Sequence, residues 1–305
     1  MNNWKFLTKD AQKQLERIID ALDDKISKDY SLLGGNTGTA LLFYYYWLYT
    51  QDDKYLEKGN QIILDNFDKI KILNNNMFSL CNGISGFFWA VNHLITNDFI
   101  EGDSSELFEE YDAVVYSVMQ SEIDKGNYDF LHQALGMGLY FIDRNTIQTQ
   151  KYVESLIFGL EKTAKIDENG LKWKSFYHTS GNSGEEVYNL SLSHGIASII
   201  AFLGKAYQRN IAKEKTKDLL CRSITFLLSK KSDTPNEITG AFFPSVVYMD
   251  ENKREYGSRL AWCYGDLGIG MALWQASQTL QNKEWERISL DILLHTTTRT
   301  NPVKE

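Results

Sequence analysis

The sequence predicts an all-α fold, an α/α toroid in which two concentric layers of helices form a double-layered barrel. Glycine-bearing junctions recur along the chain, each leads into an apolar stretch, and amphipathic stretches lie between them. Only 3 prolines occur in 305 residues, as suits a mostly helical chain. The junctions lie near residues 34–38, 83–86, 129–136, 194–198 and 263–268.

The junctions share a Gly-x-x-Gly pattern, in which Gln133 and Ser198 are substitutions. Glycine tolerates a positive φ and lets two backbones approach closely, so it suits a tight turn ahead of a helix. Successive copies lie about 50 to 70 residues apart, which is the length of a helix pair. One such pattern alone is a weak signal, because helical glycines often only permit close packing, but five copies in phase indicate a repeat.

Each junction leads into a stretch that is apolar most of the way round, such as residues 39–47 and 87–91. We expect these stretches to form buried inner helices. The stretches between them, such as residues 56–65 and 216–227, are amphipathic and are expected to form outer helices with one face in water. The residues just before the inner helices then converge on one mouth of the ring.

A single domain, residues 1–305, is expected, because no Pro/Gly/Ser-rich linker interrupts the chain and 43% of its residues are hydrophobic. The net charge of −8 disfavours binding to nucleic acid or to an anionic membrane. The sequence opens without the apolar region of a signal peptide, and no apolar run predicts a membrane span. Because 3 cysteines are too few for a disulfide framework, we expect a cytoplasmic protein.

Polar residues at the last three junctions are candidates for chemistry. Asp129 opens the third junction, His194 lies in the fourth, and Arg259, Cys263 and Tyr264 lie in the fifth. A repeated junction that varies its polar residue can direct several reactive groups at one centre. We expect Cys263, a potential soft metal ligand, to match the position of His194 one repeat earlier.

With these residues in view, the chain resembles the lanthionine synthetase C-like family, the cyclases of lanthipeptide biosynthesis. The resemblance begins near residue 30 and rests on Tyr128-Asp129, Ser193-His194-Gly195, Arg259 and Trp262-Cys263-Tyr264-Gly265, in that order. It implies an α/α toroid with a zinc ion in its mouth. It also implies an enzyme that adds a peptide cysteine thiol to a dehydroalanine or dehydrobutyrine of the same peptide, which closes a thioether ring.

The resemblance implies a Zn²⁺ cofactor for which only one ligand is matched. The family binds zinc through the cysteine of the Trp-Cys-Tyr-Gly motif, here Cys263, and through an adjacent Cys-His pair in the next repeat. No Cys-His dipeptide occurs in this sequence, and no cysteine follows Cys263. We therefore expect a toroid that is incomplete at its C-terminus, either because the sequence is a truncated version of a longer protein or because the last repeat has been lost.

His194 is the best candidate for an acid–base residue, because imidazole takes and gives a proton near neutral pH and the enolate of the reaction must be protonated at carbon. The alternative is a histidine that only bonds to the backbone of the turn. Asp129 can orient His194 or stabilise its positive charge. The alternative for Asp129 is a helix N-cap, a position that aspartate favours.

Arg259 carries a fixed cation suited to an enolate oxygen or a peptide carbonyl. Its alternative is a surface or carboxylate-paired arginine. Tyr264 can donate a hydrogen bond to the same centre, or it can simply pack. Cys263 could be a ligand of a zinc ion whose open coordination position takes the substrate thiol, and coordination would deprotonate that thiol. The alternative for Cys263 is a buried free cysteine.

Three functions remain open at this point. The first is a zinc-assisted cyclase acting on a dehydrated precursor peptide, with a separate dehydratase as a partner and with neither nucleic acid nor a membrane span involved. The second is a non-catalytic toroid that binds a peptide or a partner enzyme, which the missing Cys-His pair favours. The third is a toroidal glycosidase, which needs two carboxylates across a cleft; only Asp129 and Asp266 lie at junctions.

Overall fold

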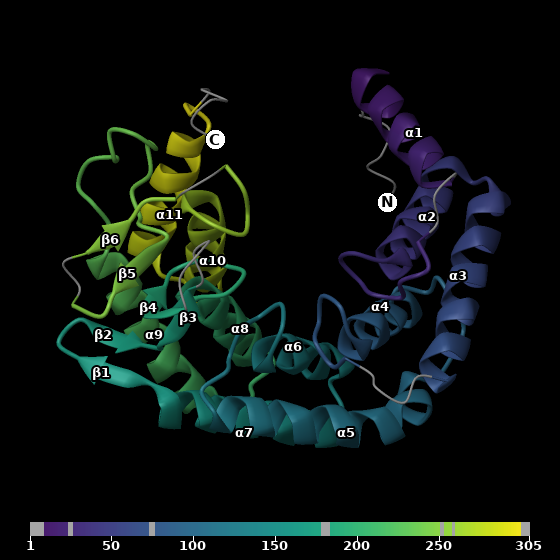
Figure 1. Cartoon of the computed structure of the whole chain (residues 1–305), viewed down its shortest axis with the longest axis horizontal. Helices are drawn as coiled ribbons and strands as arrows, with labels where there is room; N and C mark the ends of the chain where they lie inside the picture. Colours follow the sequence, from purple (N-terminus) through teal and green to yellow (C-terminus); the bar gives the residue numbers. More distant parts are fainter. Residues whose placement is uncertain are drawn as a thin grey trace. The chain divides into compact units, whose positions relative to one another are not determined.

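The computed structural model describes residues 9–23, 27–72, 77–177, 184–250, 253–257 and 260–299. Within these ranges the chain is mostly helical and its strands are short (Figure 1). Contacts divide the chain into two compact units, Met1–Glu110 and Tyr111–Glu305. The single domain predicted from the sequence stays a prediction. Among the described helices, none combines the length and apolar composition that crossing a membrane requires.

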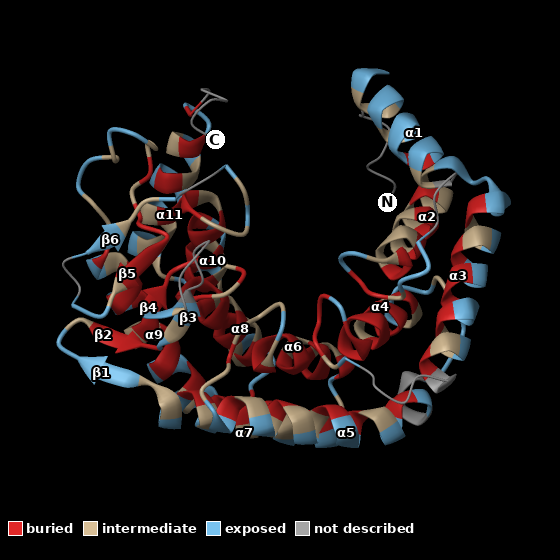
Figure 2. Ribbon diagram, viewed as in Figure 1, coloured by how far each residue is buried: buried red, intermediate tan, exposed pale blue. Residues whose placement is uncertain are grey.

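The first unit is built from helices alone in its described part. It contains α1 (Lys9–Asp23), α2 (Asn36–Thr50), α3 (Asp53–Ile72), α4 (Ile84–Thr96) and the start of α5 (Ser104–Asp124). Helix α2 packs along α3 and also contacts α4. Helix α4 is buried over most of its surface, whereas α3 alternates buried and exposed residues (Figure 2). This contrast confirms the predicted difference between inner and outer helices.

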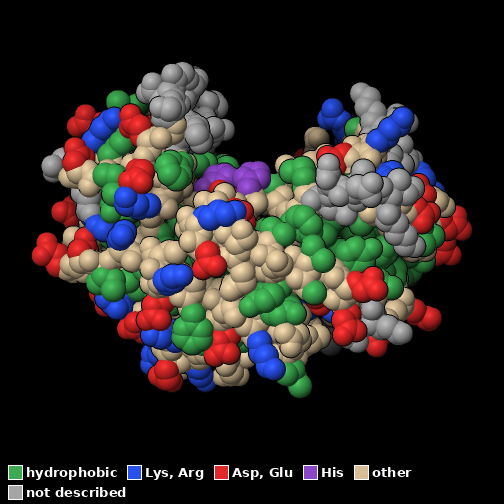
Figure 3. Space-filling view, turned by 60° about the horizontal axis from the view of Figure 1, so that its bottom comes forward, with side chains coloured by type: hydrophobic (Ala, Val, Ile, Leu, Met, Phe, Trp, Pro, Cys, Tyr) green, Lys and Arg blue, Asp and Glu red, His purple; other side chains and the backbone are tan. Residues whose placement is uncertain are grey.

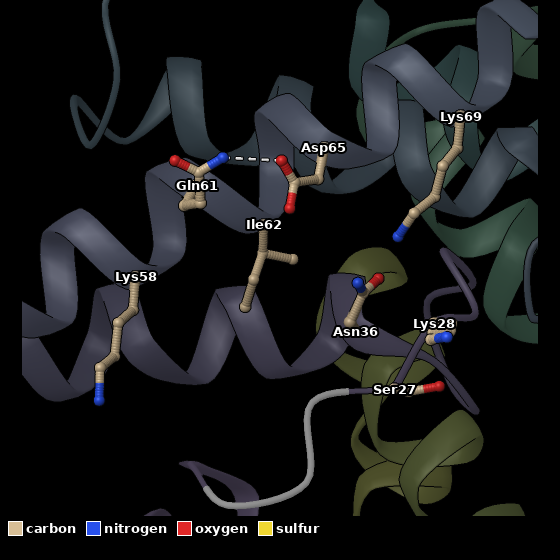
Figure 4. A pocket seen from close by; sticks show the side chains of 8 residues that line it. All are labelled: Ser27, Lys28, Asn36, Lys58, Gln61, Ile62, Asp65 and Lys69. Atoms are coloured by element: carbon tan, nitrogen blue, oxygen red, sulfur yellow. Dashed lines mark hydrogen bonds between the residues drawn. The ribbon is translucent and has the colours of Figure 1, made fainter.

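A pocket of 300 Å³ lies in the first unit, where α3 meets the start of α2 (Figure 4). Gln61 donates a hydrogen bond of 2.7 Å to Asp65 on its wall. The described lining holds lysines but neither histidine nor cysteine. The candidate residues for acid–base chemistry and for metal binding all belong to the second unit.

In its described residues the second unit contains six complete helices in two layers. These are α6 (Ala134–Arg144), α7 (Ile147–Thr163), α8 (Ile196–Gln208), α9 (Lys213–Ser229), α10 (Asp266–Leu280) and α11 (Lys283–Thr296). Each helix that follows a junction packs on the next helix in the chain, in the pairs α6–α7, α8–α9 and α10–α11. In addition, α8 contacts both α6 and α10, and α7 contacts α9. The predicted pairing of a buried and an amphipathic helix in each repeat therefore holds within this unit.

Short strands occupy the connections before the fourth and fifth junctions, and the sequence did not predict them. A hairpin joins β1 (Lys165–Asp167) to β2 (Gly170–Lys172). An antiparallel sheet has the order β3-β4-β5-β6, formed by Ser175–Tyr177, Glu185–Asn189, Val246–Tyr248 and Arg254–Glu255. In its centre Tyr188 pairs with Val247. Strand β4 ends at Asn189, directly before the turn of the fourth junction, so the sheet fixes where that turn begins.

The junction glycines are required mainly by close backbone approach. The residues that cap the junction helices are Gly35, Gly83, Gln133, Gly195 and Gly265. A Cβ atom on Gly195 would lie 2.2 Å from the carbonyl oxygen of Asn189, and one on Gly86 would lie 1.9 Å from that of Leu80. Among the capping residues only Gly265 has a positive φ, at 111°.

Candidate active site

The turn before a junction helix uses one side-chain oxygen as a fixed point. Oδ1 of Asp129 accepts hydrogen bonds from the backbone N–H groups of Leu131, at 2.8 Å, and His132, at 2.9 Å. Asp29 in the first repeat and Asn189 in the fourth make the same bond to the residue two positions on. Asp129 therefore occupies a position at which this repeat uses Asp or Asn to hold the turn.

The other oxygen of Asp129 faces His194. The imidazole Nδ1 of His194 lies 2.5 Å from Oδ2 of Asp129, and the side chains are 24% and 20% exposed. The backbone N–H of His194 donates to Oγ of Ser191 at 3.1 Å. A carboxylate at Nδ1 orients the ring, stabilises positive charge on it and leaves Nε2 for a substrate. Asp129 thus has both predicted roles: one oxygen holds the turn, and the other contacts His194.

Tyr264 also lies next to His194. The two ring centroids are 5.7 Å apart at an interplanar angle of 41°. The Tyr264 hydroxyl accepts a hydrogen bond from Nδ2 of Asn189 at 3.3 Å. Burial raises the pKa of the Tyr264 phenol, so the hydroxyl stays protonated and able to donate at neutral pH.

The expected match between Cys263 and His194 is wrong by one residue. Gly195 and Gly265 are both N-caps, so the repeat aligns Tyr264 with His194 and Cys263 with Ser193. The carbonyl oxygen of Cys263 accepts the backbone N–H of Ser193 at 3.4 Å and its Oγ–H at 3.2 Å, and so links the fifth junction to the fourth. The Cys263 side chain is half-buried.

Arg259, the remaining predicted site residue, lies outside the described residues. The structure therefore brings the side chains of Asp129, His194 and Tyr264 together. Cys263 joins them through its backbone carbonyl group, which bonds to Ser193. Two further residues join them, His132 and Asn189, to which the sequence assigned no role.

His132 immediately precedes the capping residue Gln133, so it occupies in the third repeat the position of His194 in the fourth. The two imidazole rings are nearly parallel, at 10°, with centroids 5.7 Å apart. Aligning the sequence on the capping residues would have revealed this equivalence. Figure 3 shows histidine side chains gathered at one place on the surface.

A groove of 610 Å³ has Asp129 and His132 in its wall. The rest of its lining comes from the ends of α5 and α7 and from residues of β1, β3 and β4, including Phe176, which is 63% exposed. This volume lies in the range of ordinary ligand sites, about 300 to 1,000 Å³. A molecule bound in the groove would contact Asp129 and His132, whereas His194 is not among the lining residues.

Residues 26–304 match the family described as "Lanthionine synthetase C-like protein". The chain belongs to this family. Among solved structures, this lanthionine synthetase C-like chain is similar to "Nisin cyclase", with a TM-score of 0.77 and 20% sequence identity over 97% of this chain and 77% of that chain. The likeness confirms the predicted fold class, a mostly helical lanthionine synthetase C-like toroid. No curated protein is significantly similar to the sequence.

In the described part of this lanthionine synthetase C-like chain, Cys263 is not surrounded by the ligand set that the resemblance implies for zinc. Among the described residues, Asp129, His132 and His194 place potential metal-ligand atoms within 4.8 Å of one another. Cys263 does not belong to this group. A catalytic zinc ion needs about three protein ligands. Nδ1 of His194 faces Asp129, so Nε2 would be the ring nitrogen that His194 offers to a metal ion.

The glycosidase hypothesis needs a second accessible carboxylate, and Asp266, the other carboxylate at a described junction, does not supply it. Asp266 is fully buried, and its two oxygens accept the backbone N–H groups of Phe242, at 2.8 Å, and Phe243, at 3.1 Å. Asp266 therefore holds residues 242–243 and does not face Asp129 across a cleft.

Proposed function

We propose that the protein is a cyclase that adds a peptide cysteine thiol to a dehydroalanine or dehydrobutyrine of the same peptide, forming a thioether ring. The observation that carries the proposal is the hydrogen-bonded pair of His194 and Asp129 next to Tyr264. These residues come from the third, fourth and fifth repeats. They stand in the order that characterises the lanthionine synthetase C-like family, to which the chain belongs.

The proposed reaction needs two proton transfers and no redox step. The thiol loses its proton, sulfur bonds to Cβ of the dehydro residue, and the electron pair of the double bond moves toward the neighbouring carbonyl as an enolate. Nε2 of His194 then gives a proton to Cα, while Asp129 stabilises the charge on the imidazole. The Tyr264 hydroxyl donates a hydrogen bond to the developing enolate oxygen, where the fixed charge of Arg259 would also act.

The proposed substrate is a dehydrated precursor peptide, so a separate dehydratase would act before this protein, in the cytoplasm. The groove beside Asp129 and His132 supports a peptide substrate, because its volume of 610 Å³ accommodates several residues of an extended chain. The exposed ring of Phe176 offers apolar contact in its wall.

A non-catalytic protein that binds peptide without metal is the second candidate. The observation that favours it is the lack of a three-ligand group around Cys263 in the described part of the chain. Binding of a dehydrated peptide with no conversion to a ring would support this candidate.

A synthetic peptide carrying one dehydroalanine and one cysteine tests the proposal. Ring closure leaves the mass unchanged but removes the thiol, so it is measured as the loss of alkylation by a thiol reagent. We expect turnover by the wild type and a rate about 10² to 10⁴-fold lower for His194→Gln, the range for loss of an acid–base residue. Lys283→Gln, an exposed change on α11, is the control. Wild-type protein that closes no ring above the uncatalysed rate would sink the proposal.

A further inference from the structure

The residue immediately before the N-cap is the position at which successive repeats place their reactive side chains. Counting back from the N-caps, this position holds His132, His194 and Tyr264 in the third, fourth and fifth repeats. His194 is a neighbour of both other rings, because its centroid lies 5.7 Å from each of them. The repeat thus places a second imidazole beside the one that the proposed function uses.

One carboxylate contacts both histidines, the backbone of one and the ring of the other. Oδ1 of Asp129 accepts the backbone N–H of His132 at 2.9 Å, and Oδ2 holds Nδ1 of His194 at 2.5 Å. The two side chains differ in their surroundings: His194 contacts Asp129 and Tyr264, whereas His132 is exposed and lies in the wall of the groove. A peptide in the groove would contact His132 directly, with His194 as the neighbour of that ring.

The two imidazoles offer two separate positions for proton transfer. Nδ1 of His194 faces Asp129, which leaves Nε2 of that ring for the substrate, and the neighbouring His132 lies in the wall of the groove. Thiol addition needs both positions, because a proton leaves sulfur and a proton arrives at Cα.

We propose that His132 is a second proton-transfer residue, the base that activates the substrate thiol. The inference rests on the proposed cyclase function. The S–H bond breaks and its proton goes to a ring nitrogen of His132, while sulfur bonds to Cβ and the double-bond electron pair moves onto Cα. Cα then takes the proton from Nε2 of His194. His132 ends protonated and His194 neutral, and transfer of one proton from ring to ring or through solvent restores the starting state.

This role supplies thiol activation from the chain's own residues. Among the described residues, Cys263 does not belong to a group of three potential metal ligands, whereas His132 does, so metal binding by His132 is the alternative that the test must exclude. His132 lies in the wall of the groove, next to the residue that returns the proton.

A substrate whose nucleophile is already ionised tests the inference. Two peptides are compared that differ only in carrying cysteine or selenocysteine with one dehydroalanine, because a selenol is ionised at neutral pH and needs no base. We expect His132→Gln to lower the cysteine rate about 100-fold and the selenocysteine rate less than about threefold, after subtraction of the uncatalysed rates. We expect His194→Gln to lower both rates, because Cα must be protonated in either case.

Lys283→Gln, an exposed change on α11 outside the groove, is the control and should leave both rates near those of the wild type. Equal losses with both peptides in His132→Gln would show that His132 only shapes the site, and no loss would show that it is dispensable; either result overturns the inference. Near-stoichiometric zinc that is present in the wild type and lost in His132→Gln would overturn it too, because His132 would then be a ligand. If the wild type closes neither ring, the proposed function itself fails, which is a distinct outcome.

Discussion

Asp129 shows how one residue can satisfy both the fold and the chemistry. Its Oδ1 holds a turn that Asp29 and Asn189 hold in other repeats, and its Oδ2 contacts His194. Sequence reasoning treated a capping role and a catalytic role as alternatives. Because a carboxylate has two oxygens, the structure permits both at once.

The two roles of Asp129 can be separated by substitution. Asn189 holds its turn with an amide oxygen, so Asp129→Asn should keep the turn while losing the acceptor for His194. We expect an unchanged thermal midpoint and ring closure about 100-fold slower, because the imidazole is no longer oriented or charge-stabilised. Asp129→Ala should lose both contacts and lower the midpoint as well. Wild-type ring closure by Asp129→Asn, measured with the dehydroalanine peptide, would refute the orienting role.

At the scale of elements, the glycines of the junctions determine where the inner helices begin. Gly86 lies near the start of α4, where a Cβ would approach the carbonyl oxygen of Leu80 to 1.9 Å. At Gly34, in the first junction, a Cβ would meet nothing closer than 3.6 Å, the Oγ of Ser31. The repeat therefore needs some of its glycines and tolerates replacement of others.

Alanine substitutions at these two positions should give different stabilities. Gly86→Ala should lower the free energy of unfolding by about 1 to 3 kcal/mol, because the backbone must shift to relieve the contact. Gly34→Ala should change it little and serves as the matched control. Urea unfolding followed by circular dichroism at 222 nm measures both. Equal urea midpoints for the two variants would contradict the role of close approach.

The helices were predictable because their signals are local, and the strands were not. A glycine pattern followed by an apolar stretch located the start of each inner helix to within a few residues. The strands have two to five residues, too few to show an alternating pattern. Their pairing is also distant in sequence, since Tyr188 pairs with Val247. The residues next to Tyr188 and Val247 in the sequence do not indicate that these two strands pair.

At the scale of the whole molecule, the site is formed by residues from several repeats, and no single motif contains it. Asp129, His194 and Tyr264 were predictable from residue type and order, and their contacts place them in one site. His132 and Asn189 were missed because each looks ordinary in its own segment. Their positions acquire meaning only when the repeats are aligned on the N-caps.

Asp266 links the buried core of the second unit to the pH dependence of folding. It is the first residue of α10, fully buried, with two backbone N–H groups of residues 242–243 on its oxygens. Burial raises the pKa of Asp266 above the ordinary value of 3.8, although those two hydrogen bonds oppose the rise. The folded chain therefore holds this proton more tightly than the unfolded chain does.

The sign of the effect follows from that difference in proton binding. The stabilising contribution is fully present below the ordinary pKa of an aspartate and is lost as the pH rises through the raised pKa of Asp266 in the folded chain. The slope is at most about 1.4 kcal/mol per pH unit. Residue 266 cannot titrate in Asp266→Asn, so the free energy of unfolding of this variant should lack the decline. At low pH the variant should be less stable than the wild type, because the amide has one acceptor oxygen for two N–H groups. Urea unfolding of both proteins from pH 4 to 7 measures the difference, in which all other titrating groups cancel. Two parallel profiles would mean that Asp266 ionises as easily in the folded chain as in the unfolded one.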